Sequence, residues 1–200
     1  MPDSGIADGA TFSSAFWDSY VREQVVTTCT SSTRPTNVEG RLIYETNTDR
    51  LLMGTGSGSN WIILAEPAQT WAAPTVSGLT AGNGTWDAVY RRSDGYCHIR
   101  GRFTLGSTSS VTGALLVTLP FTAASNTQNG QFTGGFYDSG TNYLGISYLT
   151  GNATQFYFGA IGAGGTYATI VAASGSVPAS LGTGDVIDFS GTFRMANRYD

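Results

Sequence analysis

The chain has 200 residues, of which 27 are glycine, 40% are hydrophobic and only 12% are charged. Charged residues are about half as frequent and glycine about twice as frequent as in an average globular protein, which excludes a disordered chain and predicts many short strands joined by tight turns. The net charge of -4 argues against nucleic acid as a partner, because phosphate binding needs a basic surface.

The first predicted segment, residues 1–34, contains one amphipathic helix after a loose Gly/Asp-rich start. Six apolar residues recur every four positions and would form a stripe along the helix: Phe12, Phe16, Trp17, Tyr20, Val21 and Val25. Ser13 is a suitable N-cap, and the helix is expected to end near Val26. A helix of about 13 residues is not stable alone in water. Its aromatic face is therefore predicted to dock onto the same chain, a symmetry mate or another protein.

The second predicted segment, residues 35–66, is a small β-meander. Its three strands are expected at residues 41–45, 50–53 and 61–64, each bounded by a turn or a Gly-rich loop. A sheet of three short strands is only marginally stable by itself. We therefore expect this segment to pack against a partner, with Trp61 among the anchoring or oligomer contacts.

The third predicted segment, residues 67–200, is an antiparallel β-sandwich with jelly-roll-like wiring. About eight strands are expected between Gly-rich turns: 85–90, 96–105, 114–119, 130–137, 143–149, 155–161, 167–172 and 186–195. The Asp94-Gly95 pair indicates a hairpin between the first two. The chain as a whole is thus predicted to be mainly β, with a short N-terminal helix and a small β-meander followed by the sandwich.

Alternate residues of the strand at 96–105 are predicted to face opposite sides of its sheet. Cys97, Ile99, Gly101, Phe103 and Leu105 face one way, and Tyr96, His98, Arg100, Arg102 and Thr104 face the other. This places Cys97 in the core as a small apolar residue. It also places the only histidine on a face that carries arginines, which predicts a surface or interface residue.

Catalytic chemistry is not expected. A histidine that acts as a general base needs a nucleophile or a carboxylate within reach, and no triad is recognisable around His98. Asp185 and Asp188 are the nearest pair of carboxylates that could cleave a glycan. Residues three apart on a regular strand point to opposite faces, so these two cannot converge on a substrate. We therefore predict that the protein is not an enzyme.

No cofactor, metal or membrane insertion is expected either. The two cysteines, Cys29 and Cys97, are far apart, and the sequence has no Cys/His cluster that would hold zinc. The N-terminus does not have the pattern of a signal peptide. No apolar stretch approaches the roughly 20 residues that span a bilayer.

Two sets of residues could form a binding surface. Four arginines occupy one predicted hairpin and are interpreted as a solvated or interface face: Arg91, Arg92, Arg100 and Arg102. Five aromatic residues in or near turns could stack on the apolar face of a sugar: Trp86, Tyr137, Tyr143, Tyr157 and Tyr167. The alternative for these rings is packing in a core or a subunit interface.

Residues 34–64 carry the most distinctive motif. It consists of Arg34-Pro35-Thr36-Asn37-Val38-Glu39-Gly40, then Tyr44, Thr46 and Thr48-Asp49-Arg50-Leu51-Leu52, then Gly58 and Trp61. The motif resembles a segment of tail-associated proteins of bacteriophages. The preceding Tyr20-Val21-Arg22-Glu23-Gln24-Val25-Val26 is similar to a helix of minor tail proteins of actinobacterial phages. Together these resemblances cover roughly residues 10–66.

The resemblance implies a virion protein. Phage fibres of this kind are usually homotrimers with an N-terminal anchor and a C-terminal domain that contacts the host. The first hypothesis is therefore a minor tail or fibre protein of the virion that contacts other virion proteins and binds a host-surface glycan as a homotrimer. The second is a capsid decoration or head-fibre protein. The third is an enzyme that depolymerises the host polysaccharide.

Overall fold

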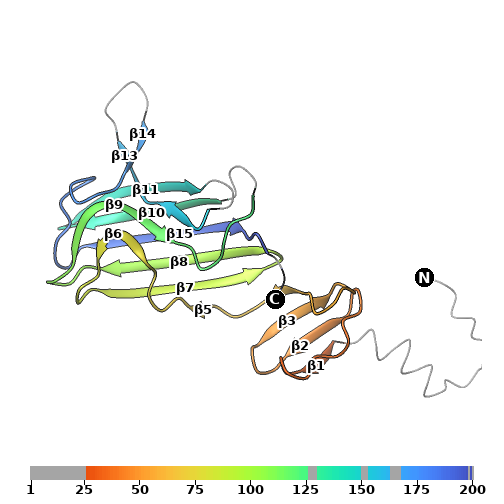
Figure 1. Cartoon of the computed structure of the whole chain (residues 1–200). Coiled ribbons are helices and arrows are strands. Elements are labelled where there is room, and N and C mark those ends of the chain that lie inside the picture. Colours follow the sequence, from red (N-terminus) through yellow and green to blue (C-terminus); the bar gives the residue numbers. More distant parts are fainter. Residues whose placement is uncertain (1–25, 126–129, 150–152, 163–167, 198, 200) are drawn as a thin grey trace, which may run out of the picture. The chain divides into compact units, whose positions relative to one another are not determined.

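The computed structural model describes residues 26–125, 130–149, 153–162, 168–197 and 199. These residues contain fifteen β-strands and no helix, and the chain divides into two compact units, one ending at Leu64 and the other comprising Ala65–Tyr199 (Figure 1). The predicted mainly β fold is confirmed. The predicted helix, with Phe12, Phe16, Trp17, Tyr20 and Val21, lies outside the described residues.

The smaller unit is a four-stranded sheet in the order β1-β2-β3-β4. The strands are β1 (Thr27–Cys29), β2 (Leu42–Glu45), β3 (Arg50–Gly54) and β4 (Trp61–Ala65). β2, β3 and β4 are the three predicted strands, whereas β1 was missed. β1 lies in the Thr/Ser-rich stretch after the predicted helix and pairs with β2 in parallel, so no local hairpin pattern marked it.

The core of the smaller unit is built from its own residues. Ile43, Leu52, Trp61 and Ile63 form one buried cluster, with Cys29 packed against it. Trp61 is only 2% exposed. Trp61, predicted to be among the anchoring or oligomer contacts, lies in the core of its own unit together with Ile43, Leu52 and Ile63.

Residues of the distinctive motif hold the smaller unit together. Glu45 is fully buried on β2, where it forms an ion pair with Arg34 and accepts a hydrogen bond from the Thr48 hydroxyl at 2.7 Å. At the same turn the Tyr44 hydroxyl donates to Oδ1 of Asp49 at 2.8 Å. These contacts satisfy a buried carboxylate and fix the β2–β3 turn. These residues of the motif thus contribute to the local fold of the smaller unit.

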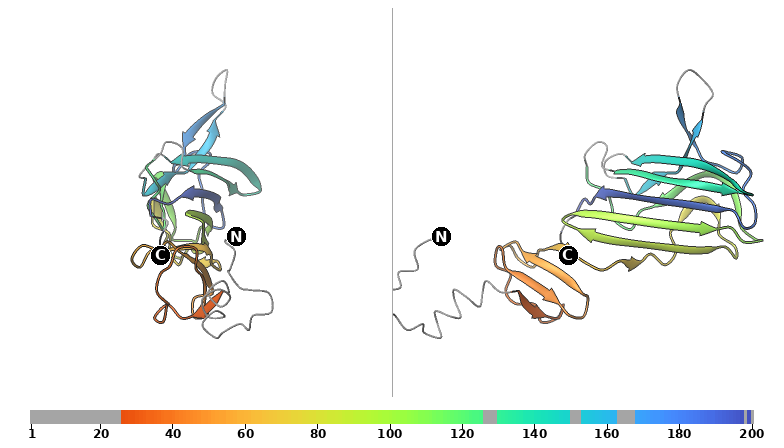
Figure 2. Two further views of the ribbon diagram at one scale, coloured as in Figure 1. Left: turned by 90° about the vertical axis from the view of Figure 1, so that its right-hand side faces the viewer. Right: turned by 180° about the vertical axis from the view of Figure 1, so that it is seen from behind.

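The larger unit contains two antiparallel sheets. One has eight strands in the order β14-β13-β11-β10-β15-β8-β7-β5, and the other has three in the order β12-β9-β6. The strands are β5 (Gln69–Thr70), β6 (Val76–Thr80), β7 (Thr85–Ser93), β8 (Tyr96–Thr104), β9 (Ser110–Thr118), β10 (Gly130–Asp138), β11 (Thr141–Leu149), β12 (Gln155–Tyr157), β13 (Gly159–Gly162), β14 (Thr169–Ala172) and β15 (Val186–Arg194). Figure 2 (right) shows β15 lying between β10 and β8 in the middle of the larger sheet. All eight predicted strands have counterparts, and β5 and β6 are additional.

The segment predicted as one strand at residues 155–161 is two strands in different sheets. β12 pairs with β9 in the three-stranded sheet, and β13 pairs with β11 and β14 in the eight-stranded sheet. Phe158 lies between them, where its N–H donates to Leu115 O and its C=O accepts from the N–H of Ala173, both at 2.9 Å. The chain therefore passes from one sheet to the other without losing backbone hydrogen bonds at the crossing.

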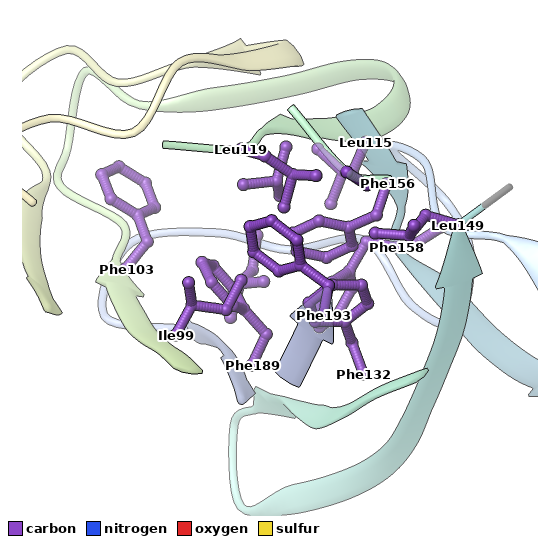
Figure 3. Packing of buried hydrophobic residues seen from close by; sticks show 14 of the residues in the cluster. Ile99, Phe103, Leu115, Leu119, Phe132, Leu149, Phe156, Phe158, Phe189 and Phe193 are labelled. Carbon is purple, nitrogen blue, oxygen red and sulfur yellow. The ribbon is translucent and has the colours of Figure 1, made fainter. Parts of the chain in front are cut away.

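The core between the two sheets is rich in phenylalanine (Figure 3). Phe132 on β10 stacks on Phe156 on β12 with ring centroids 4.2 Å apart, so this pair joins the two sheets. The ring of Phe189 lies where a side chain at position 101 would be: a Cβ on Gly101 would come within 2.3 Å of its Cζ. Cys97 is fully buried in this core, which confirms its predicted place.

Two tight turns fix the register of the strands that surround the site. Asp94 and Gly95 both have positive φ angles, 47° and 77°, and connect β7 to β8 as predicted. Ser139 and Gly140 have φ angles of 45° and 93° and connect β10 to β11. Positive φ at both central residues matches the right-handed twist of the flanking strands.

Candidate functional site on the outer face of the larger sheet

Five central strands of the larger sheet, β7, β8, β15, β10 and β11, present a continuous outer face. On β8 the buried residues alternate with exposed or partly exposed ones, so that Ile99 and Phe103 face the core while Arg100 and Arg102 face outward. The same alternation on β15 places Asp188 and Ser190 outside. The outer face is therefore polar over β8 and β15, as expected when one side of a strand is solvated.

The pairing registers align the outward residues into rows that cross the strands. One row runs Asp87, Arg102, Asp188, Gly135 and Leu144 from β7 to β11. The adjacent row runs Val89, Arg100, Ser190, Thr133 and Ile146. Neighbouring strands are about 4.8 Å apart, so each row is roughly 19 Å long.

An open groove of about 620 Å³ lies over the middle of these rows. The side chains that line it belong to Arg100, Arg102, Thr133, Leu144, Asp188 and Ser190. A second hollow of about 370 Å³ adjoins it, shares Leu144 and Asp188 with it, and extends to Tyr137 and Asn142. Gly135, which has no side chain, lies in the row between Asp188 and Leu144. The two hollows therefore form one continuous depression, which we call the outer groove.

Two arginines and one aspartate line the outer groove, and a second aspartate, Asp87, lies beside it. Arg100 contacts Asp87 at 3.4 Å, but both side chains are more than two-thirds exposed, at 69% and 68%. Such an exposed pair contributes little stability. Within the described part of the chain, Arg102 and Asp188 form no ion pair, although they are direct partners across β8 and β15. The guanidinium of Arg102 and the carboxylate of Asp188 thus line the groove with hydrogen-bonding capacity that the fold does not use, while Arg100 lines it and contacts Asp87 beside it.

A third hollow of about 490 Å³ lies beyond Arg100 and contains His98 and Arg91. Nδ1 of His98 lies 2.8 Å from the Thr192 hydroxyl on β15. Burial, and then the charge of Arg91, lower the pKa of His98, so its imidazole is neutral at pH 7 and adds no charge to this face. The partly buried ring fits the predicted surface or interface residue.

The two carboxylates weighed as a catalytic pair have separate roles. Asp185 is buried just before β15, and its two oxygens accept hydrogen bonds from the N–H groups of Gly182 at 2.6 Å and Ser139 at 3.2 Å. Asp185 therefore links the turn that contains Gly182 to the turn that contains Ser139. Asp188 is exposed and lines the outer groove.

Neither a metal cluster nor a membrane span is found in the part of the chain that the structure describes. No three or more His, Cys, Asp or Glu side chains there are grouped so that they could hold a metal ion. No helix among the described residues is long and apolar enough to cross a bilayer.

The five predicted sugar-contacting aromatics lie in different places. Tyr137 is 44% exposed and lines the outer groove. Tyr143 borders the same hollow but is partly buried against the core, and Trp86 packs on Phe103 with ring centroids 4.7 Å apart. Tyr157 is 58% exposed but lies on β12 in the other sheet. Tyr167 lies outside the described residues.

Most groove residues were not singled out by the sequence. Arg100 and Arg102 were noted only as part of an arginine face, and Asp188 only as half of a catalytic pair. The sequence of residues 186–195 also alternates, with Ile187 and Phe189 on one side and Asp188 and Ser190 on the other. The sequence does not show that β15 pairs with β8 and β10, and this pairing brings the polar face of β15 beside the arginines.

The fold and the site together define an all-β protein with two compact units and an open groove on the outer face of its larger sheet, lined by charges of both signs. Comparison of the chain with protein-family models, with curated proteins and with solved structures finds no match.

Proposed function

We propose that this chain is a non-enzymatic structural protein of a bacteriophage virion, a minor tail or fibre protein that binds a glycan on the surface of the host cell. The observation that carries the proposal is the outer groove, an open depression lined by guanidinium, carboxylate, hydroxyl and amide groups together with Leu144 and Tyr137. Sugars combine hydroxyl groups that donate and accept hydrogen bonds with apolar C–H faces. A groove that offers both chemistries suits them.

The proposed anchor is the N-terminal part of the chain. The motif of residues 34–64 resembles tail-associated phage proteins, and the predicted helix over residues 13–26 carries an aromatic stripe that needs a protein partner. This arrangement would attach a homotrimer to other virion proteins and leave the groove of each copy available. Three weak sites on one trimer bind a repetitive cell surface far more tightly than one.

The test is competition for adsorption. Host cells incubated with an excess of the purified chain are expected to adsorb particles of the encoding phage more slowly, because the chain occupies the same surface glycan. Unchanged adsorption would contradict the adhesion role. Mass spectrometry of purified particles separates the locations: a tail or fibre protein is expected in few copies, and a capsid decoration or head fibre in many.

The same protein preparation tests the enzymatic alternative. Incubation with host polysaccharide is expected to release no new reducing ends, because Asp185 accepts hydrogen bonds from two turns, and the outward carboxylates Asp87 and Asp188 lie on strands separated by β8, with Arg102 between them. Release of reducing ends above that of a heat-inactivated sample would overturn the non-enzymatic part of the proposal.

A further inference from the structure

The outer groove restricts the class of glycan, and this inference rests on the proposed function. Arg100 and Arg102 on β8 line the groove between two carboxylates, Asp188 on β15, which also lines it, and Asp87 on β7, which lies beside it and contacts Arg100. A polyanionic chain would be attracted by the arginines but repelled by carboxylates on both sides of them. A positively charged chain would be attracted by the carboxylates but repelled by the arginines between them.

Arg102 and Asp188 together form a donor and an acceptor of fixed spacing. They are direct cross-strand neighbours, a pairing in which Cβ atoms lie about 4.5–5.5 Å apart. A guanidinium donates two parallel hydrogen bonds and a carboxylate accepts two. Two adjacent hydroxyl groups of a sugar ring can accept from the guanidinium and donate to the carboxylate at the same time.

The rows on either side of this pair add further polar groups to the groove. Ser190 and Thr133 add hydroxyl groups in the next row, and Asn142 adds an amide at the far end. Leu144 is 64% exposed and follows Asp188 in the row with only Gly135 between them, so its apolar side chain can gain by covering the C–H face of a ring. A row roughly 19 Å long spans several sugar rings rather than one.

We propose that the outer groove binds an uncharged polysaccharide chain, with Arg102 and Asp188 engaging neighbouring hydroxyl groups of one sugar and Leu144 and Tyr137 packing against the rings beyond it. The direction of the chain follows the row from β8 to β11. Binding of this kind depends little on salt, because a neutral ligand has no charge for the salt to screen.

The experiment uses polysaccharide from the host envelope, separated by anion exchange into a neutral and an anionic fraction. The purified chain is expected to bind the neutral fraction, and the affinity is expected to change less than about twofold between about 0.05 and 0.5 M NaCl. Asp188→Asn and Arg102→Gln are each expected to weaken binding about ten- to a hundredfold, the effect of losing charge-assisted hydrogen bonds.

Two matched controls keep the test specific. Asp94→Asn changes an exposed carboxylate in the β7–β8 turn, and Arg194→Gln changes an exposed arginine near the end of β15. Both are expected to bind the neutral fraction like the unaltered chain. Because Asp188 and Arg102 are exposed, circular dichroism is expected to show all four variants folded.

Each contrary result has a distinct meaning. Binding to the anionic fraction alone overturns the neutral class but leaves host adhesion standing. Neutral binding that Asp188→Asn and Arg102→Gln do not weaken overturns the assignment to this groove. If neither fraction binds, the inference is wrong; the proposed function then fails as well only if the chain also does not slow adsorption of the phage.

Discussion

The ion pair between Glu66 and Arg92 supports a quantitative prediction. Glu66 follows β4 and has a completely buried side chain, and its carboxylate accepts hydrogen bonds from Nε and Nη2 of Arg92, both at 3.0 Å, and from the main-chain N–H of Arg92 at 2.9 Å. The guanidinium also lies 5.1 Å from the ring centroid of Phe121. Arg92→Met keeps most of the side-chain volume but leaves the buried carboxylate without its charged partner.

Removal of one partner from a buried pair costs about 3–5 kcal/mol. For an m-value of about 2 kcal/mol per molar urea, the unfolding midpoint of the larger unit is expected to fall by roughly 2 M. The double variant Glu66→Leu with Arg92→Met is expected to recover most of this loss, because replacing both partners by apolar residues removes the stranded charge. The interaction between the two sites should therefore be strongly non-additive.

The measurement is urea unfolding, monitored by hydrogen exchange and mass spectrometry. Peptides from β8 and β15 report on the unfolding of the larger unit. Peptides from β2 and β3 provide an internal control from the other unit. A midpoint shift below about 0.5 M for Arg92→Met, or a double variant as unstable as the single one, would refute the claim that a stranded charge sets the cost.

Three further predictions test the core, the thiols and the assembly. Gly101→Ala is expected to destabilise the larger unit by about 1–3 kcal/mol, because the new methyl group would overlap the Phe189 ring. The control is Gly113→Ala, where the atom nearest to the new methyl group is 3.7 Å away. Equal melting temperatures of the two variants would contradict the prediction. Burial raises the pKa of Cys97 to about 12, so iodoacetamide at pH 8 is expected to modify Cys29, which is only partly buried, well before Cys97; equal rates by peptide mass spectrometry would show that the core opens freely. Light scattering of the full chain at micromolar concentration is expected to give the mass of a trimer, and a monomer would remove the multivalent basis of the proposed adhesion.

The strands of the larger unit were predictable where local pattern and burial agree. Residues 96–105 alternate strictly, and Asp94-Gly95 can adopt the two positive φ angles that its turn requires, so β7 and β8 followed from sequence alone. β5 has only two residues, and β6 contains an irregularity between Ser77 and Leu79. Neither leaves a period of two long enough to recognise.

The site was less predictable than the strands that build it, because it depends on contacts between residues distant in sequence. Asp188 and Arg102 are more than eighty positions apart and become neighbours only because β15 inserts between β8 and β10. The aromatic residues near turns predicted a sugar-binding role, but the ring of Trp86 packs against the buried Phe103. A periodic pattern shows which residues share a face of one strand, and it contains no information about which strand lies next to it.

The two faces of the central strands separate stability from recognition. On β8 and β15, Phe103 and Phe189 are buried in the core while Arg102 and Asp188 project outward from the same strands. Exchange of an exposed residue changes stability by about 0.5 kcal/mol or less, whereas truncation of a buried phenylalanine costs about 3–5 kcal/mol. The chemistry of the groove can therefore change one side chain at a time while the phenylalanine core holds the strands in register. The proposed adhesion role would use this separation, because a receptor can vary while the fold that presents the groove stays the same.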